Sequence, residues 1–125
     1  MTRFAIVRDE DGATAVEFAI TFPFVAALLF GIIEVGLLIW VQLGLQHGAE
    51  MAARCATVNP SICSDLSSIQ KYAAQQAFGV NPPPAVFTVT TPACGNQVNA
   101  SYAFESVTSY VGLSQTINAQ ACFPK

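Results

Sequence analysis

The stretch GATAVEF at residues 12–18 opens the segment that decides the fold of this chain. From Phe18 to Ile33 there is no charged residue, and after Glu34 the apolar character resumes from Val35 to Leu45. About 20 predominantly apolar residues are enough to span the hydrocarbon core of a bilayer. The segment therefore predicts a transmembrane helix.

Two carboxylates lie within this apolar segment. Glu17 is about one helical turn inside its start, and an ionised side chain at mid-bilayer costs roughly 2.5–3.5 kcal/mol. Glu17 therefore needs an interfacial position or a partner. Glu34 lies about 25 Å of helix further on, where it either snorkels to the outer interface or contacts another subunit. Trp40 fits the aromatic belt of that interface.

Composition bounds the function. Of 125 residues, 53% are hydrophobic and 10% are charged, whereas charged residues make up about 25% of an average soluble domain. The net charge is −3 with five basic residues, so no basic patch supports nucleic-acid binding. With one histidine, His47, and no nucleophile elbow, phosphate loop or metal-ligand spacing, we expect no enzyme, cofactor, metal or small-molecule substrate.

The four cysteines all follow the apolar segment. An even number in a small extracytoplasmic module indicates two disulfides, for which three connectivities exist. We favour Cys55–Cys63 with Cys94–Cys122, because these pairs close the shorter loops. Four free thiols, or a zinc site that includes His47, are the alternatives.

Charge and cysteine positions agree on topology. Arg3 and Arg8 precede the apolar segment and only Arg54 follows closely, which places the N-terminus in the cytoplasm. The cysteines place the C-terminal part in an oxidising space. The apolar run is about twice the 7–15 residues of a signal peptide core, so an uncleaved signal anchor is the simpler alternative.

The region from about Ala13 to Thr57 is predicted to be one helix. Its second half turns polar and continues outside the membrane as an amphipathic stem, which Asn59-Pro60 ends. Pro23 should kink or loosen the membrane part. The helix also holds four glycines that are weak points or close-contact positions: Gly31, Gly36, Gly44 and Gly48. The last two match the small-xxx-small packing pattern, which is frequent by chance.

The remainder predicts a small α+β unit. Ser64 or Asp65 can cap a short second helix, which Gly79 and the triproline at 82–84 end. Period-two alternation then predicts strands at residues 87–90, 98–105 and 116–121, with a loop or helical turn at 107–113. The fold class is α+β: a long membrane helix and stem, packed on a short helix and a three-stranded antiparallel sheet. We divide the chain into a leader at 1–12, helix and stem at 13–57, and a disulfide-stapled domain at 58–125.

Taken together, these parts resemble type IV pilin-like proteins, and most closely the TadE-like pseudopilins of the bacterial tight-adherence (Tad/Flp) pilus systems. The resemblance is carried by Gly12, residues 15–19 (AVEFA), Pro23 and residues 30–36 (FGIIEVG), where Gly31, Glu34 and Gly36 lie. Residues 52–54 (AAR) and 121–124 (ACFP) are also similar.

The resemblance implies cleavage by a prepilin peptidase between Gly12 and Ala13, on the cytoplasmic side. Glu17 would become the fifth residue of the mature chain, followed by Phe18, and would pair with the terminal amine of a neighbouring subunit. The implied partners are the inner membrane, the peptidase, other pilin-like subunits and the Tad assembly platform. The implied role is in pilus assembly, adhesion and biofilm formation, from a single-pass position with the C-terminal domain in the periplasm, and entry into an extracellular pilus stays open.

Two alternatives stay open at this point. The first is an uncleaved single-pass anchor that displays a periplasmic interaction module unrelated to pili. The second is a periplasmic enzyme on a stalk.

Overall fold

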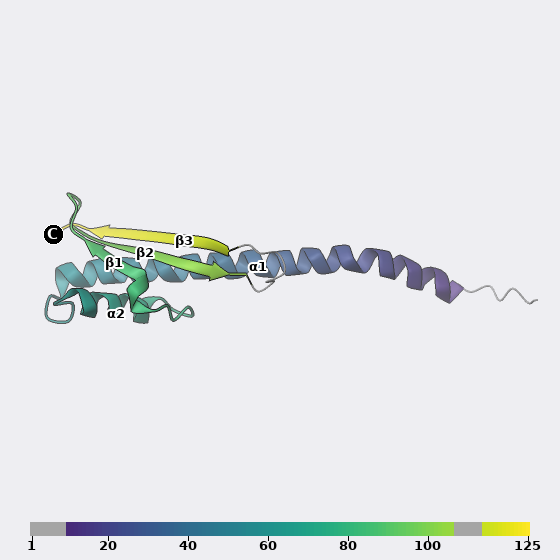
Figure 1. Cartoon of the computed structure of the whole chain (residues 1–125), viewed down its shortest axis with the longest axis horizontal. Coiled ribbons are helices and arrows are strands. Elements are labelled where there is room, and N and C mark those ends of the chain that lie inside the picture. Colours follow the sequence, from purple (N-terminus) through teal and green to yellow (C-terminus); the bar gives the residue numbers. More distant parts are fainter. Residues whose placement is uncertain (1–9, 107–113) are drawn as a thin grey trace, which may run out of the picture. The chain divides into compact units, whose positions relative to one another are not determined.

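The computed structural model describes residues 10–106 and 114–125. The predicted leader falls mostly, and the predicted loop at 107–113 entirely, outside the described residues. The chain divides between Val35 and Gly36 into two compact units, which are described separately below (Figure 1).

The first helix, α1, extends over Glu10–Val58 and continues through Pro23. It begins three residues before the predicted start, so the helix extends into the predicted leader, and it ends one residue after the predicted end, which is within the usual uncertainty of helix termini. Among the described residues, α1 is the one helix that is long and apolar enough to cross a membrane. Its most apolar stretch has a mean hydropathy of 2.5, and none of that stretch is buried. The predicted long apolar helix is therefore present.

The second unit, Gly36–Lys125, holds the core. The last turns of α1, the helix α2 (Leu66–Gln76) and the strands all contribute to it. Phe87, Leu45 and Val98 are its largest fully buried side chains. Several small residues on the two helices, and the one that directly follows α2, are also buried: Ala49, Ala52, Ala53, Ala73 and Ala77. Small side chains let two helices and a sheet approach closely within so short a chain.

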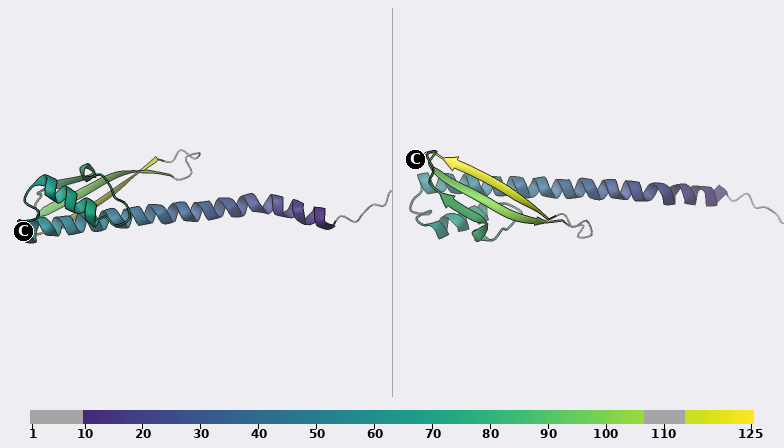
Figure 2. Two further views of the ribbon diagram at one scale, coloured as in Figure 1. Left: turned by 90° about the horizontal axis from the view of Figure 1, so that it is seen from below. Right: turned by 45° about the horizontal axis from the view of Figure 1, so that its top comes forward.

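The sheet is antiparallel with the order β1-β2-β3, where β1 is Phe87–Thr90, β2 is Asn96–Glu105 and β3 is Ser114–Phe123. A 3₁₀ turn, η1 (Pro84–Val86), leads out of the triproline into β1. In β2, Val98, Ala100 and Phe104 are buried, whereas the residues between them are more exposed. The α+β class and the half-buried three-stranded sheet are therefore confirmed. The part of α1 that belongs to the second unit and the helix α2 pack against the sheet (Figure 2).

The edge strand β3 is joined to α1 by amide side chains. Gln42 Nε2 donates to the carbonyl oxygen of Asn118 at 3.1 Å, and Gln46 Nε2 donates to that of Gln120 at 3.1 Å. An edge strand presents backbone groups that lack a neighbouring strand. Polar residues of the stem therefore occupy two of these groups, a role that the helical pattern of the stem does not indicate.

The close approach of α2 to α1 depends on two glycines. A Cβ placed on Gly48 would lie 2.6 Å from the carbonyl oxygen of Ala73 and 3.2 Å from Ala77 Cβ. A Cβ on Gly44 would lie 2.8 Å from Val80 Cγ2. The small-xxx-small pattern is thus used inside this chain, to seat α2 and the loop that follows it.

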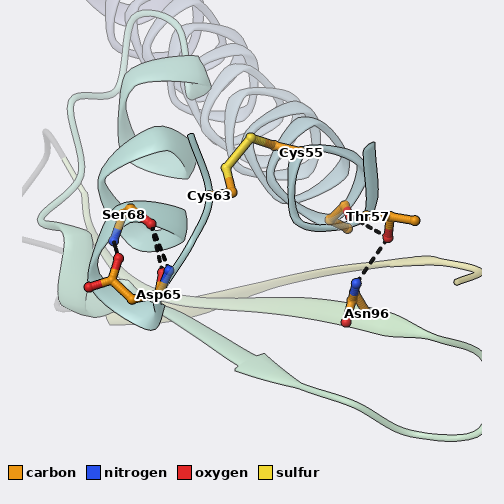
Figure 3. The surroundings of a disulfide bond; sticks show 7 residues. Cys55, Thr57, Cys63, Asp65, Ser68 and Asn96 are labelled. Carbon is orange, nitrogen blue, oxygen red and sulfur yellow. Dashed lines mark hydrogen bonds between the residues drawn. A yellow bond between two sulfur atoms is a disulfide. The ribbon is translucent and has the colours of Figure 1, made fainter. Parts of the chain in front are cut away.

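Two disulfides staple the unit, and they are the pairs favoured from loop length. Cys55 is joined to Cys63 with a Cα–Cα distance of 5.9 Å, and Cys94 to Cys122 with 6.3 Å. The first ties the end of α1 to the segment before α2 (Figure 3). Beside it, Asn96 Nδ2 donates to Thr57 Oγ1 at 2.9 Å, which links the start of β2 to the last turn of α1.

The helix α2 begins at a capping box formed by Asp65 and Ser68. The backbone N–H of Ser68 donates to Asp65 Oδ1 at 3.1 Å, and the backbone N–H of Asp65 donates to Ser68 Oγ at 3.1 Å (Figure 3). Ser67 Oγ donates to Asp65 Oδ2 at 3.0 Å. These hydrogen bonds, those from Ser68 first, hold the pKa of Asp65 below its ordinary value of 3.8.

This cap predicts a pH dependence of stability. Because the pKa is lowered in the folded state, the stabilising contribution of Asp65 is complete above the unfolded pKa, about 3.9, and is lost as pH falls through the folded pKa. Asp65→Asn, which still caps a helix but does not titrate, should be less stable than the native chain at pH 7, and this difference should shrink at pH 3. Denaturant unfolding of the full chain in detergent at both pH values tests this, and an unchanged difference contradicts it.

Candidate functional site

The residues that the sequence marks for processing and assembly occupy the first turns of α1. Gly12, Ala13, Glu17 and Phe18 are all helical and exposed. Ala13 and Glu17 are four residues apart, so they lie on the same side of the helix, about 6 Å apart along its axis. The structure thus brings the predicted cleavage point and the predicted pairing carboxylate together on one exposed helix end.

The polar groups beside Glu17 are satisfied within the helix. Thr21 Oγ1 donates to the backbone carbonyl oxygen of Glu17 at 2.8 Å, which removes an unpaired hydroxyl from a surface that is otherwise apolar. Phe18 and Phe22 pack with ring centroids 5.4 Å apart. The Glu17 carboxylate is therefore the functional group that this helix end presents to its surroundings.

Large apolar side chains cover the rest of the helix in the first unit. In the part of the chain that the structure describes, most of them are more than half exposed: Val16, Phe18, Ile20, Phe22, Phe24, Val25, Leu28, Leu29, Phe30, Ile32, Ile33 and Val35. A surface of this size in contact with water would be strongly unfavourable. This surface must therefore be covered by lipid or by other apolar helices, or by lipid first and by helices later.

The other predicted helix features lie further along α1 and do not join the Glu17 end. A Cβ added to Gly31 or Gly36 would have no neighbouring atom within 4 Å among residues 10–106 and 114–125, so neither glycine serves a close contact with another described element. Glu34 is half-buried and lies 17 residues after Glu17, about 25 Å along the helix. The two glycine positions are thus open to contacts with other molecules.

Sequence reasoning missed an aromatic group that joins α1 to the end of α2. Trp40 packs edge-to-face on Phe78 with ring centroids 5.9 Å apart, and the His47 ring lies 5.2 Å from Phe78. His47 Nδ1 donates to the carbonyl oxygen of Gln76 at 3.0 Å, near the end of α2. His47 is half-buried, and its hydrogen bond holds the end of α2. Of these residues, only Trp40 was singled out by the sequence as an interfacial aromatic residue, because it follows the apolar run.

Metal-binding side chains are not assembled in the part of the chain that the structure describes. No three His, Cys, Asp or Glu residues among residues 10–106 and 114–125 are placed to hold a metal ion, and all the cysteines are in disulfides. The exposed end of α1 remains the candidate site, on the residues that the sequence marks there.

Comparison with known proteins gives one finding. Residues 12–54 match the model of a family described as TadE-like protein. The match begins at Gly12, covers about a third of the 125 residues and includes Glu17, Glu34 and both pairs of helix glycines. No curated protein and no solved structure matches the chain. The resemblance to TadE-like proteins is confirmed over this segment.

Proposed function

We propose, from the TadE-like identity of residues 12–54, that the chain is a minor pseudopilin of a tight-adherence pilus system and acts by assembly rather than by catalysis. The observation that carries this proposal is the coincidence of three features on one helix: the family segment begins at Gly12, a carboxylate follows at the fifth position, and the apolar surface beyond is uncovered. Its contribution would be to pilus assembly, and through it to surface adhesion and biofilm formation.

The membrane is the first partner. Before assembly, α1 spans the inner membrane with the leader in the cytoplasm, as Arg3 and Arg8 favour, and the disulfide-bonded unit lies in the oxidising periplasm. In this position Glu17 lies near the cytoplasmic headgroups, where a carboxylate stays hydrated at small cost. From this position in the bilayer, α1 can move into contact with apolar helices of other subunits.

The second partner is a prepilin peptidase. It would hydrolyse the amide bond between Gly12 and Ala13 with one water molecule, which leaves a carboxylate on Gly12 and an α-ammonium on Ala13. A peptidase binds an extended segment, so the first turn of α1 must open. Glycine costs a helix about 1 kcal/mol relative to alanine, so Gly12 eases that opening.

The third partner is another pilin-like subunit. When α1 leaves the membrane for a bundle of apolar helices, Glu17 loses its water, and an unpaired charge there is costly. The α-ammonium of a neighbouring mature subunit neutralises it and sets the axial register between the two helices. An uncleaved chain has no α-ammonium at Ala13, so cleavage must precede assembly.

Cleavage is tested by intact-mass analysis of the protein from its native cell. We expect a chain that begins at Ala13, lighter by the first twelve residues. Gly12→Val, which hinders both the opening and the close approach of a peptidase, should retain the full length, whereas Gly31→Ala, a substitution into open space, should be cleaved normally. A full-length native protein in cells with normal pili would favour the uncleaved interaction module instead.

A further inference from the structure

An exposed aromatic patch lies where α1 leaves its most apolar stretch. It consists of Trp40, Leu43 and Phe78, which are 52%, 57% and 47% exposed, and we call it the Trp40–Phe78 patch. Trp40 and Phe78 are in ring contact, and Leu43 follows Trp40 by three residues, so it lies on the same side of α1. Two of its members belong to the long helix, but Phe78 comes from the loop after α2.

The patch is held rigidly. Gly79 has a φ of +75°, and a Cβ on it would lie 2.6 Å from Trp40 Nε1, so the indole lies directly against the Gly79 backbone. The N–H of Phe78 donates to the carbonyl oxygen of Gln76 at 2.9 Å, and the N–H of Val80 donates to that of Ala77 at 3.3 Å. Phe78 is therefore kept exposed by a fixed loop, although the domain core lies next to it.

The sequence places this patch at the depth of the lipid headgroups. A span of about 20 residues that starts at Phe18 ends at Leu37, and Trp40 lies about 4.5 Å further along the helix. The hydrocarbon core is about 30 Å thick and the whole bilayer about 40–45 Å, which leaves about 5–8 Å of interface on each side. The ring centroids of Phe78 and Trp40 are 5.9 Å apart, which is within the thickness of that layer, so one layer can hold both rings.

The chemistry of the patch and its surroundings suits the same layer. The chain has no Asp, Glu, Lys or Arg from Val35 to Ala49, nor from Tyr72 to Phe104, so the two segments that form the patch bring none of these charged side chains into the interface. The Trp40 indole N–H has no acceptor in the described part of the chain and can donate to a lipid phosphate or ester carbonyl. Aromatic rings with one polar edge favour this position.

We propose that the Trp40–Phe78 patch docks in the periplasmic headgroup layer of the bilayer that α1 spans, so that the loop after α2 seats the folded domain on the membrane surface. This rests on the membrane anchor of the proposed function, but on neither cleavage nor pilus assembly. The lipid surface is favoured over a second copy of the chain as occupant because Trp40 follows the uncovered apolar run of α1 within one helical turn of the end of the predicted span.

The test uses fluorescence of the full chain reconstituted in phosphatidylethanolamine and phosphatidylglycerol bilayers. Trp40 is the only tryptophan, so Trp40→Phe with Phe78→Trp moves the only indole to position 78. We expect this indole, like that of Trp40, to lose most of its emission with lipids brominated high on the acyl chains and little with aqueous acrylamide. Val58→Trp in the Trp40→Phe background is the matched control, because Val58 is also an exposed apolar residue, at 56%, but about 27 Å further along α1 than position 40. It should respond to acrylamide alone.

Each outcome decides the proposal. If the indole at position 78 is quenched by acrylamide and not by brominated lipid, as in the Val58→Trp variant, lipid docking is overturned. Lipid docking is also overturned if the indole is shielded from both quenchers and this shielding increases with protein concentration, because that result indicates contact between copies of the chain. Leu28→Trp in the Trp40→Phe background reports on the anchor itself: if lipids brominated deep in the chain do not quench it, the membrane span fails, and with it the proposed function. Mass mapping of both disulfides checks folding. In the unmodified chain, a headgroup spin label should broaden the amide NMR signal of Gly79 but not that of Gly95, and the reverse would also overturn the proposal.

Discussion

Glu17→Gln is expected to leave the chain inserted in the membrane and to reduce its incorporation into pili by roughly 100-fold or more, since removing one partner of a buried ion pair costs about 3–5 kcal/mol. The remaining partner is the α-ammonium of Ala13 in a neighbouring subunit, which would be buried without a counter-charge. Incorporation is measured as the fraction of the protein found in sheared filaments relative to that in the membrane.

Insertion should be unaffected for a separate reason. Glu17 is exposed at the end of α1, and its removal lowers the charge that the bilayer must accommodate. The large apolar surface from Val16 to Val35 is unchanged and dominates the affinity for lipid. The substitution therefore separates the two environments that the helix meets: lipid, where Glu17 is merely tolerated, and the helix bundle, where it is needed.

The matched control is Glu105→Gln, which removes a carboxylate from the exposed end of β2. It has the same change in charge and should keep normal incorporation. A second comparison combines Glu17→Gln with the uncleavable Gly12→Val chain, in which the amine is absent. In that background the substitution should produce no further loss in co-purification with other subunits. Normal filament incorporation of the Glu17→Gln chain would refute the pairing.

The elements of this fold were predictable because each has a strong local pattern. The uninterrupted apolar run from Phe18, the cap at Asp65, and the period-two alternation from Val98 to Phe104 each depend on neighbours in sequence. The candidate site was predictable for the same reason, since Gly12, Ala13 and Glu17 form one contiguous motif on a single helix. Loop length likewise favoured the two disulfide pairs that the structure contains.

The contacts between elements were not predictable, because they depend on which faces meet. His47 and Gln76 are 29 residues apart, and nothing in either local sequence indicates that the imidazole holds the end of α2. Likewise, Gln42 and Gln46 look like solvated stem residues until β3 is placed beside them. Phe78 follows a helix and gives no sign that it will meet Trp40. Periodicity identifies a buried face, but not its partner.

The spacing of Gly44 and Gly48 is the clearest case of a signal that only the structure makes specific. The sequence offers four helix glycines, and the family match includes them all. In the structure they separate into two classes: a Cβ on Gly31 or Gly36 meets nothing, whereas one on Gly44 or Gly48 meets α2 or the loop after it. The first pair is open to other molecules, and the second pair is used by the domain itself.

Gly48→Ala is therefore expected to destabilise the domain, although alanine is the better helix former. The new methyl group would lie 2.6 Å from the Ala73 carbonyl oxygen, which already accepts the hydrogen bond of Ala77 N–H at 3.0 Å. The carbonyl group of Ala73 cannot rotate away from the new methyl group as a side chain could, so the whole of α2 must shift. Overpacking of this kind costs about 3 kcal/mol at the upper end of the usual range, and the gain in helix propensity returns about 1 kcal/mol, which leaves a net loss of about 2 kcal/mol.

Gly36→Ala, on the same helix, is expected to change the stability in the opposite direction. With nothing near its Cβ, it gains helix propensity alone and should be neutral or up to about 1 kcal/mol more stable. Denaturant unfolding of both full-length variants in the same detergent should thus differ by about 2–3 kcal/mol. Trp40 emission should also change in the Gly48→Ala protein and not in the other, because a shift of α2 carries the Phe78-Gly79 loop away from the indole. Equal stabilities would mean that α2 does not approach α1 through Gly48.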